Sequence, residues 1–130
     1  MPKQKILLVD DDANLVRALS LRLAAHGFET LVAMDGYSAV ANTLKERPDL
    51  IILDLGLPAG DGFSVLERLR VNPKLMSLPV IVLSARDPLG SEERALKAGA
   101  TAYFQKPVDN EELLNAIRAS LPAAAQTASV

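Results

Sequence analysis

The sequence predicts an α/β fold: a flavodoxin-like, doubly wound parallel sheet of the (βα)5 type. Three aliphatic runs, at residues 6–9, 50–53 and 80–83, are short and unbroken, as in strands buried on both faces. Strand signals alternate with helical spacing of apolar residues five times along the chain. Because crossovers between parallel strands are right-handed, helices should cover both faces of the sheet. The strand order 2-1-3-4-5 is the arrangement that we expect.

The first two β–α units extend to Pro48. The first strand, 6–9, is followed by a helix that ends at Gly27, which supplies a C-terminal stop. The second strand, 28–33, contains Glu29 and is more polar than the others, so we place it at an edge of the sheet. The apolar positions of the two helices are Leu15, Val16, Leu19, Leu23, Ala39, Val40 and Leu44.

The third and fourth units share this plan. The strand at 50–53 is followed by a loop and by a helix that Gly62 begins and that ends near Asn72. The strand at 80–83 leads into a helix over 91–98, which Gly99 stops. The apolar face of the third helix carries Val65, Leu66 and Leu69.

The last unit completes a single domain. A strand over 102–105 precedes Asp109 and Glu112, whose spacing is that of a capping box. The last helix buries Leu113, Leu114, Ile117 and Leu121. We therefore expect the domain to cover residues 4–121, with 122–130 forming a flexible tail or the start of a linker.

Composition excludes several classes of protein. The 130 residues carry a formal net charge of −2 and no basic stripe, which argues against direct binding of nucleic acid. There is no cysteine, so disulfides and Cys-ligated zinc are excluded. No apolar run approaches the ~18 residues of a membrane helix, so we expect no membrane association and a cytoplasmic location.

Four strands stop at residues that a metal- and phosphate-binding site would need. The residues at these four ends are Asp10 and Asp11, Asp54, Ser84 and Lys106. Ligands of open parallel sheets bind outside the carboxyl ends of the strands. If the first strand borders the third, Asp10 and Asp11 lie beside Asp54, and the sequence predicts one site assembled from distant segments.

Phosphoryl transfer would use each of these residue types. Two carboxylates about 4 Å apart repel by roughly 4 kcal/mol at an effective dielectric of 20, so the cluster needs raised pKa values or a cation. Mg2+ prefers oxygen ligands of this kind. Asp54 would then be the nucleophile, while Ser84 and Lys106 would hold the phosphoryl oxygens.

Taken singly, these residues have ordinary structural explanations. An Asp after a strand is often a helix N-cap, as we expect for Asp12. Ser84 alone is more often a turn residue, and Lys106 alone is more often a solvated charge. Tyr103 is equally compatible with a core aromatic whose hydroxyl reaches water. The conjunction at four strand ends is what favours a shared site.

With these residues in view, the chain resembles the receiver domain of two-component response regulators, the CheY-like family, over residues 4–121. The matching segments are Asp10-Asp11, 54–62, Ser84-Ala85, 98–100 and Lys106-Pro107. The resemblance implies a phosphorelay protein that is not an enzyme beyond its own phosphorylation and dephosphorylation. It also implies a histidine kinase or histidine phosphotransfer protein as the phosphoryl donor.

The resemblance also implies roles at the metal site. Asp54 would be the phosphoacceptor. Asp11 and Asp54 would bind Mg2+ directly and Asp10 through water, with the Gly56 carbonyl completing the protein ligands.

A switch is implied as well. Ser84 and Tyr103 would be the switch pair, Lys106 would bind phosphate, and the Lys106–Pro107 peptide bond would be cis. Phosphorylation would reshape the surface made by the fourth helix, last strand and last helix, where a downstream effector would dock. The family habit of forming homodimers through the fourth and fifth helices makes a homodimer a further expectation.

Two positions depart from common members of the family. Gly56 has no side chain where many relatives carry Met or Asn, and Arg86 is a bulky cation near the same opening. We predict that Gly56 leaves the path of an attacking water open and that Arg86 partly covers the phosphoryl group.

Three other classes of protein compete with a receiver. A Mg-dependent phosphohydrolase of the haloacid-dehalogenase type would need a second acid at Gly56 and a cap, and the chain has neither. A P-loop nucleotide binder is excluded because the Gly-x-x-x-x-Gly-Lys-Ser/Thr motif does not occur. A pseudo-receiver, which binds partners without being phosphorylated, stays open.

Overall fold

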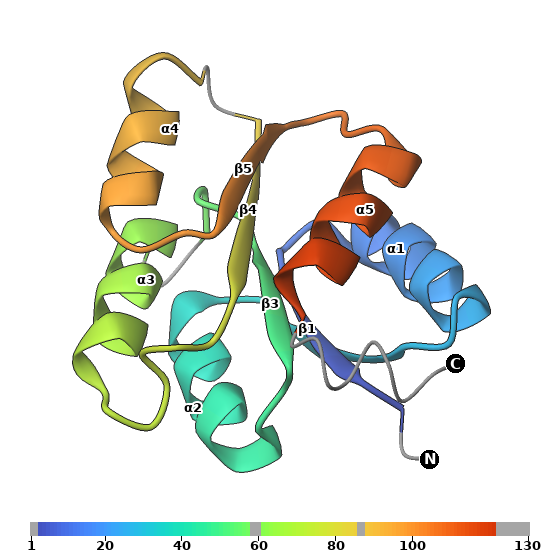
Figure 1. Cartoon of the computed structure of the whole chain (residues 1–130), viewed down its shortest axis with the longest axis horizontal. Helices are drawn as coiled ribbons and strands as arrows, with labels where there is room; N and C mark the ends of the chain where they lie inside the picture. The colour runs from blue at the N-terminus through green and yellow to red at the C-terminus, as the bar shows by residue number, and fades with distance from the viewer. Residues whose placement is uncertain (1–2, 58–60, 86–87, 122–130) are drawn as a thin grey trace.

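The computed structural model describes residues 3–57, 61–85 and 88–121 and has a central five-stranded parallel sheet (Figure 1). The strand order is β2-β1-β3-β4-β5, and all four pairings are parallel, which confirms the predicted topology. The strands are β1 (Lys5–Val9), β2 (Glu29–Ala33), β3 (Leu50–Leu53), β4 (Val80–Ser84) and β5 (Ala102–Gln105).

Five helices cover the two faces of the sheet, α2, α3 and α4 on one side and α1 and α5 on the other (Figure 1). They are α1 (Ala13–Ala25), α2 (Gly36–Glu46), α3 (Gly62–Val71), α4 (Pro88–Lys97) and α5 (Asn110–Ser120). Each face has its own cluster of buried aliphatic side chains. The doubly wound α/β fold expected from the sequence is therefore the fold that forms.

The burial of the strands follows their position in the sheet. Every residue of β3 is buried, because this strand has neighbours on both sides and helices on both faces. In the edge strand β2, Glu29 is exposed and Val32 is 42% exposed. The more polar second strand thus lies at an edge, as its composition predicted.

Aspartate side chains cap the N-termini of four of the helices. Asp12 accepts hydrogen bonds from the backbone N–H groups of Asn14 and Leu15 at the start of α1. Asp109 accepts one from the Glu112 N–H at the start of α5. Asp35 and Asp61 cap α2 and α3 in the same way. These bonds satisfy backbone donors that have no partner within the helix.

Three details differ from the sequence-based expectation. The second strand begins at Glu29 because Phe28 still belongs to the turn, where its N–H donates to the Leu23 carbonyl. Leu44 is 44% exposed rather than on the buried face of α2, which Ala39 and Thr43 line instead. Helix α4 is assigned from Pro88, but Leu89 and Gly90 have non-helical backbone angles, so its regular part agrees with the predicted range.

None of the helices in the described ranges combines the length and the apolar character needed to span a bilayer.

Candidate phosphoacceptor site

The backbone of the sheet brings the predicted acidic residues to one rim. Strands β1 and β3 are paired with Val9 opposite Leu53, so the residues that follow them emerge side by side. The Asp54 N–H donates to the Val9 carbonyl (2.9 Å), and the Asp10 N–H donates to the Ala33 carbonyl (3.1 Å). These bonds extend the sheet by one residue and fix the positions of both carboxylates.

Three carboxylates form a cluster at this rim. Carboxylate oxygens of Asp10, Asp11 and Asp54 all lie within 4.8 Å of one another. Asp10 and Asp54 are each 7% exposed, whereas Asp11 is exposed. A compact set of oxygen donors with one side open to solvent suits a hard divalent cation such as Mg2+.

Lys106 approaches the cluster from the end of β5. Its Nζ lies 2.7 Å from Asp10 Oδ2 and 3.6 Å from Asp54 Oδ1. The Lys106 N–H donates to the Ser84 carbonyl (2.8 Å), which anchors the backbone, and the Lys106–Pro107 peptide bond is cis. One cation therefore lies among three carboxylates, and the cluster keeps a net negative charge.

Burial and charge act in opposite directions on the two buried ionisable groups. Burial raises the pKa of the Asp54 carboxyl group, and the charges of Asp10 and Asp11 raise it further, while Lys106 and a hydrogen bond from the Gly56 N–H oppose the shift. For Lys106, burial lowers the pKa, but the hydrogen bond and charge of Asp10, with the charge of Asp54, leave the pKa raised. The site thus stabilises the charged form of Lys106 and disfavours the ionised form of the Asp54 carboxyl group.

Ser84 and Tyr103 lie on the same face of the sheet. Val82 pairs with Tyr103, and Ser84 is two residues further along β4, so alternation points both residues toward the face that α3 and α4 cover. Ser84 is fully buried. Tyr103 is 9% exposed and belongs to the core cluster that includes Phe63 and Ala95, so its ring already packs inward.

Comparisons with known proteins agree with this geometry. A family model described as the response regulator receiver domain matches residues 6–118. The chain belongs to this family.

Similar proteins and structures extend the receiver assignment. RpaA, a DNA-binding dual master transcriptional regulator of Synechocystis, is 38% identical over 117 residues, which are 90% of this chain and 48% of that protein. The receiver domain of the Francisella response regulator 1452 is similar with a TM-score of 0.84 and 31% identity, covering 91% of this chain and 96% of that one. The receiver domain of the sensor histidine kinase PA1611 from Pseudomonas aeruginosa has a TM-score of 0.83 and 30% identity over 91% of this chain and 97% of that one, and its structure has a magnesium ion in the active site cleft.

The receiver spans a quarter to about half of the length of the curated relatives it matches. Membership in the family makes it a regulatory domain rather than an enzyme with a separate substrate.

The receiver places a glycine directly beside the Asp54 carboxylate. A side chain at Gly56 would begin 3.8 Å from Asp54 Oδ2, so the residue leaves this side of the carboxylate open. Arg86, predicted to cover the same opening, and the tail 122–130 lie outside the described residues.

Sequence reasoning missed the structural role of Gly62. A Cβ at this position would lie 2.6 Å from both the Asp54 carbonyl oxygen and the Leu55 Cα, so only glycine lets α3 begin against the end of β3. The Gly62 N–H donates to the Leu55 carbonyl (3.0 Å) and closes the loop. In the sequence, this glycine indicates only the start of a helix.

A groove was also missed because it forms only in the tertiary structure. It has a volume of about 380 Å3 and lies between α1 and the segment after β5. Leu15 and Leu19 line one side, Pro107 and Val108 line the other, and Lys106 is at its edge. The receiver thus has a mainly apolar surface directly beside its charged site.

Proposed function

We propose that Asp54 is the phosphoacceptor of this receiver and takes a phosphoryl group from a phosphohistidine in a Mg2+-dependent reaction. The observation that carries the proposal is the position of its carboxylate, which is buried at the rim between two further carboxylates and a lysine. Asp11 is exposed at the same rim and leaves an entry from solvent.

The residues around Asp54 fit a magnesium ion. Asp10, Asp11 and Asp54 offer only oxygen atoms, close enough together for one ion to contact several of them. The Gly56 carbonyl is a fourth candidate ligand, and it follows Asp54 by two residues. When bound, the ion supplies positive charge that reduces the repulsion between the acceptor carboxylate and the incoming phosphoryl group.

The transfer itself needs a nucleophile and charge stabilisation. A carboxylate oxygen of Asp54 forms a bond to phosphorus while the bond from phosphorus to the imidazole nitrogen breaks, and the electron pair of that bond returns to the imidazole. Lys106, now 3.6 Å from Asp54 Oδ1, can exchange part of its contact with the carboxylates for the new phosphoryl oxygens. Ser84 is the hydroxyl donor that we assign to the same oxygens.

The groove between α1 and the segment after β5 is where we place the phosphoryl donor, a histidine kinase or a histidine phosphotransfer protein. Its apolar lining begins at the Lys106–Pro107 pair, so a domain docked there brings its histidine to the rim. A donor that is itself a small molecule would reach Asp54 without this groove.

We propose that the output leaves from the β5 edge of the sheet, on the face that α4 covers. Ser84 and Tyr103 share the face below α4, so a shift of Ser84 toward a phosphoryl group would reach α4 and β5 through this face. Leu89 is 89% exposed and Leu96 46% exposed on α4, which gives the α4–β5–α5 surface apolar groups for an effector or a second receiver.

The lifetime of the phosphoryl group is a separate proposal. Gly56 leaves space beside the Asp54 carboxylate for an attacking water, and Arg86 is proposed to cover part of it. The Arg86→Ala variant should therefore lose its aspartyl-phosphate faster than the wild type. A longer lifetime would contradict the covering role.

The test of the acceptor uses two small phosphoryl donors, acetyl phosphate and phosphoramidate, followed by intact-mass spectrometry with and without Mg2+. We expect one phosphoryl adduct in the wild type with Mg2+ and none in Asp54→Asn. The control Asp49→Asn changes an exposed aspartate that precedes β3, at the opposite end of this strand from Asp54, and it should be labelled like the wild type. An adduct that persists in Asp54→Asn would assign the acceptor elsewhere, and a folded wild type without any adduct would favour the pseudo-receiver.

A further inference from the structure

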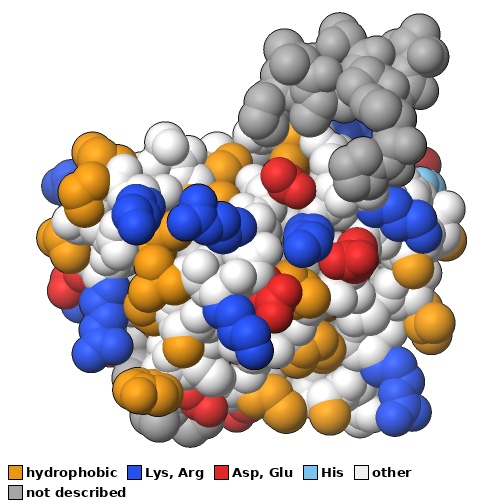
Figure 2. Space-filling model, turned by 90° about the horizontal axis from the view of Figure 1, so that it is seen from below, with side chains coloured by type: hydrophobic (Ala, Val, Ile, Leu, Met, Phe, Trp, Pro, Cys, Tyr) orange, Lys and Arg blue, Asp and Glu red, His pale blue; other side chains and the backbone are white. Residues whose placement is uncertain are grey.

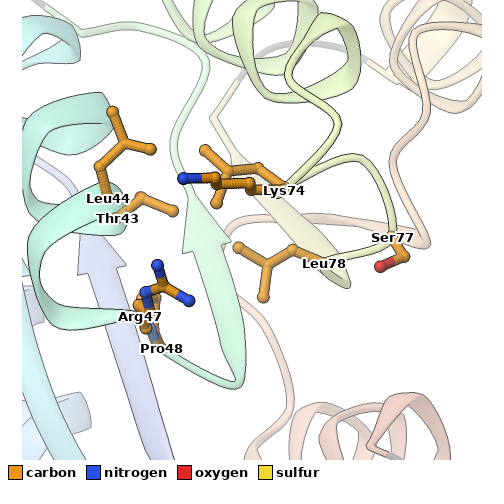
Figure 3. A pocket seen from close by; sticks show the side chains of 8 residues that line it. Thr43, Leu44, Arg47, Pro48, Lys74, Ser77 and Leu78 are labelled. Carbon is orange, nitrogen blue, oxygen red and sulfur yellow. The ribbon is translucent and has the colours of Figure 1, made fainter.

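A second cavity lies at the end of the sheet opposite the acidic rim. It has a volume of about 150 Å3 and is enclosed by the end of α2 and the segment that joins α3 to β4 (Figure 3). Its apolar lining consists of Leu44, Pro48, Leu75 and Leu78. No residue of the acidic rim contributes to it, so it is independent of the phosphoacceptor site.

Two cations face this cavity. The Lys74 ammonium group extends toward Thr43 and Leu44, and the Arg47 guanidinium group enters from the other side (Figure 3). Among the described residues, neither cation has a carboxylate within ion-pair distance. Figure 2 shows this end of the molecule, where Lys and Arg side chains are spread among apolar and acidic ones. An apolar cavity between two cations without carboxylate partners is complementary to an organic anion.

The backbone at Arg47 supports a role for its side chain. Arg47 follows α2 in the left-handed region, with φ 49°, and is the only non-glycine residue with positive φ in the described ranges. Glycine, or less often asparagine, is the usual residue at such a position because a Cβ is unfavourable there. The chain nevertheless has an arginine at this point, and an unfavourable backbone geometry is retained at the mouth of the cavity.

The other wall of the cavity is fixed by hydrogen bonds. Arg70 on α3 donates from Nη1 to the carbonyls of Met76 (2.8 Å) and Leu78 (3.0 Å). Within the same segment, the Leu78 N–H donates to the Leu75 carbonyl (3.0 Å). Because these bonds hold the backbone on which Lys74, Leu75 and Leu78 sit, a ligand meets a wall that is already formed.

We propose that this cavity binds a small organic anion with a compact apolar body and a single carboxylate. The apolar body would contact Leu75 and Leu78, and the carboxylate would lie between Arg47 and Lys74. A cavity of about 150 Å3 is known to accommodate a benzene ring, which sets the size of the body. The proposal does not depend on phosphorylation of Asp54.

The first experiment is a 15N-HSQC titration of the whole chain with benzoate and with cyclohexanecarboxylate. A ligand of about nine non-hydrogen atoms is expected to bind with a Kd of about 1–10 mM. The shifts should centre on the amides of Thr43, Leu75 and Leu78. Benzyl alcohol and acetate test the two halves of the ligand, and each should bind at least about fivefold more weakly than benzoate, because one lacks the charge and the other the apolar body.

Variants separate binding from folding. Arg47→Asn keeps a residue that tolerates the left-handed conformation, so its Tm should be unchanged or raised while its affinity for benzoate falls about tenfold. Lys74→Gln should also weaken binding severalfold. The matched control is Lys97→Gln, an exposed lysine that is paired with Glu93 (2.9 Å) and does not line the cavity, and it should bind benzoate like the wild type.

Several outcomes would overturn the proposal. Equal binding of benzyl alcohol and benzoate would mean that the cavity recognises only apolar groups. Shifts that are spread over the surface and equal in Lys97→Gln and Lys74→Gln would mean that benzoate binds non-specifically to cations. If neither benzoate nor cyclohexanecarboxylate shifts the amides of Leu75 and Leu78 at a concentration 50 times a Kd of about 1 mM, the site does not exist at the expected affinity.

Discussion

Replacing Lys106 by methionine tests the electrostatics of the acidic rim most directly. Lys106→Met keeps an unbranched side chain of similar length but removes the one described cation that lies 2.7 Å from Asp10 and 3.6 Å from Asp54. The lysine side chain is only 20% exposed, so water replaces little of its charge. Three carboxylates within 4.8 Å of one another then remain without a described cation.

The size of the effect follows from these distances. At an effective dielectric of 20, a unit charge 3.6 Å from a carboxylate contributes about 4–5 kcal/mol, before the cost of desolvating the lysine is subtracted. Removing one partner of a buried pair usually costs about 3–5 kcal/mol. Because Asp54 can take up a proton more easily once the lysine is gone, we expect a loss of about 2–4 kcal/mol in the free energy of unfolding.

The assay is urea denaturation at pH 7.5 with and without Mg2+. Saturating Mg2+ should reduce the difference between Lys106→Met and the wild type to below about 1 kcal/mol, because the ion replaces the missing positive charge at the carboxylates. Since the pKa of Lys106 is raised in the folded state, its contribution is fully present below the unfolded pKa near 10.5 and is lost as the pH rises through the folded pKa. The contribution of the lysine itself should therefore be constant from pH 7 to about 9.

The control for this experiment is Lys97→Met. Lys97 pairs with Glu93 at 2.9 Å, but both side chains are more than 70% exposed. Such pairs contribute little, so the variant should unfold within about 0.5 kcal/mol of the wild type. The reasoning is refuted if Lys106→Met is as stable as the wild type without Mg2+, or if its loss of stability is the same with and without Mg2+.

Three further predictions concern packing, hydrogen bonds and pH. Gly62→Ala puts a Cβ 2.6 Å from two backbone atoms and should lower the free energy of unfolding by about 1–3 kcal/mol in the same urea experiment. In Gly56→Ala the nearest atom to the new Cβ is 3.8 Å away, so the free energy of unfolding should stay within about 1 kcal/mol of the wild type. Arg70→Met removes hydrogen bonds to the carbonyls of Gly99, Met76 and Leu78 and should cost about 2–4 kcal/mol; a loss below about 0.5 kcal/mol would show that these bonds do not hold the segment. Asp54→Asn removes a carboxyl group whose pKa is raised by burial. Without Mg2+, the free energy of unfolding of the variant relative to the wild type should therefore increase as the pH rises above about 4. A difference that is constant with pH would contradict the raised pKa.

The sequence by itself determined the elements of this fold and the residues at their ends. Aliphatic runs such as Leu50–Leu53 specify buried strands, and an Asp before a helix supplies a cap, because both signals depend on residues adjacent in the chain. The polarity of β2 is a local signal too, and it is enough to place this strand at an edge. Right-handed crossovers favour a doubly wound sheet, and the flavodoxin-like order, one of the arrangements such a sheet can have, brings Asp10 and Asp54 together.

Contacts between segments far apart in the chain were decided only by the tertiary structure. Lys106 and Asp10 are 96 residues apart, and no local pattern indicates how closely they approach or how deeply Asp54 is buried. Gly62 has the sequence context of an ordinary helix start. The lack of space for a Cβ beside the Asp54 carbonyl arises only when α3 packs against the end of β3. Both features depend on packing through space, for which neighbouring residues carry no signal.

The same reason explains the surface features. Leu44 matched the apolar spacing of α2 but lies beside a cavity rather than in the core, because the segment between α3 and β4 does not cover it fully. Arg70 determines the course of that segment through hydrogen bonds to backbone carbonyls, which any residue can offer and which no motif records. Local patterns therefore specified the strands, the caps and the chemistry at the strand ends, whereas the distances, the burial and the cavities exist only once the helices have packed on the sheet.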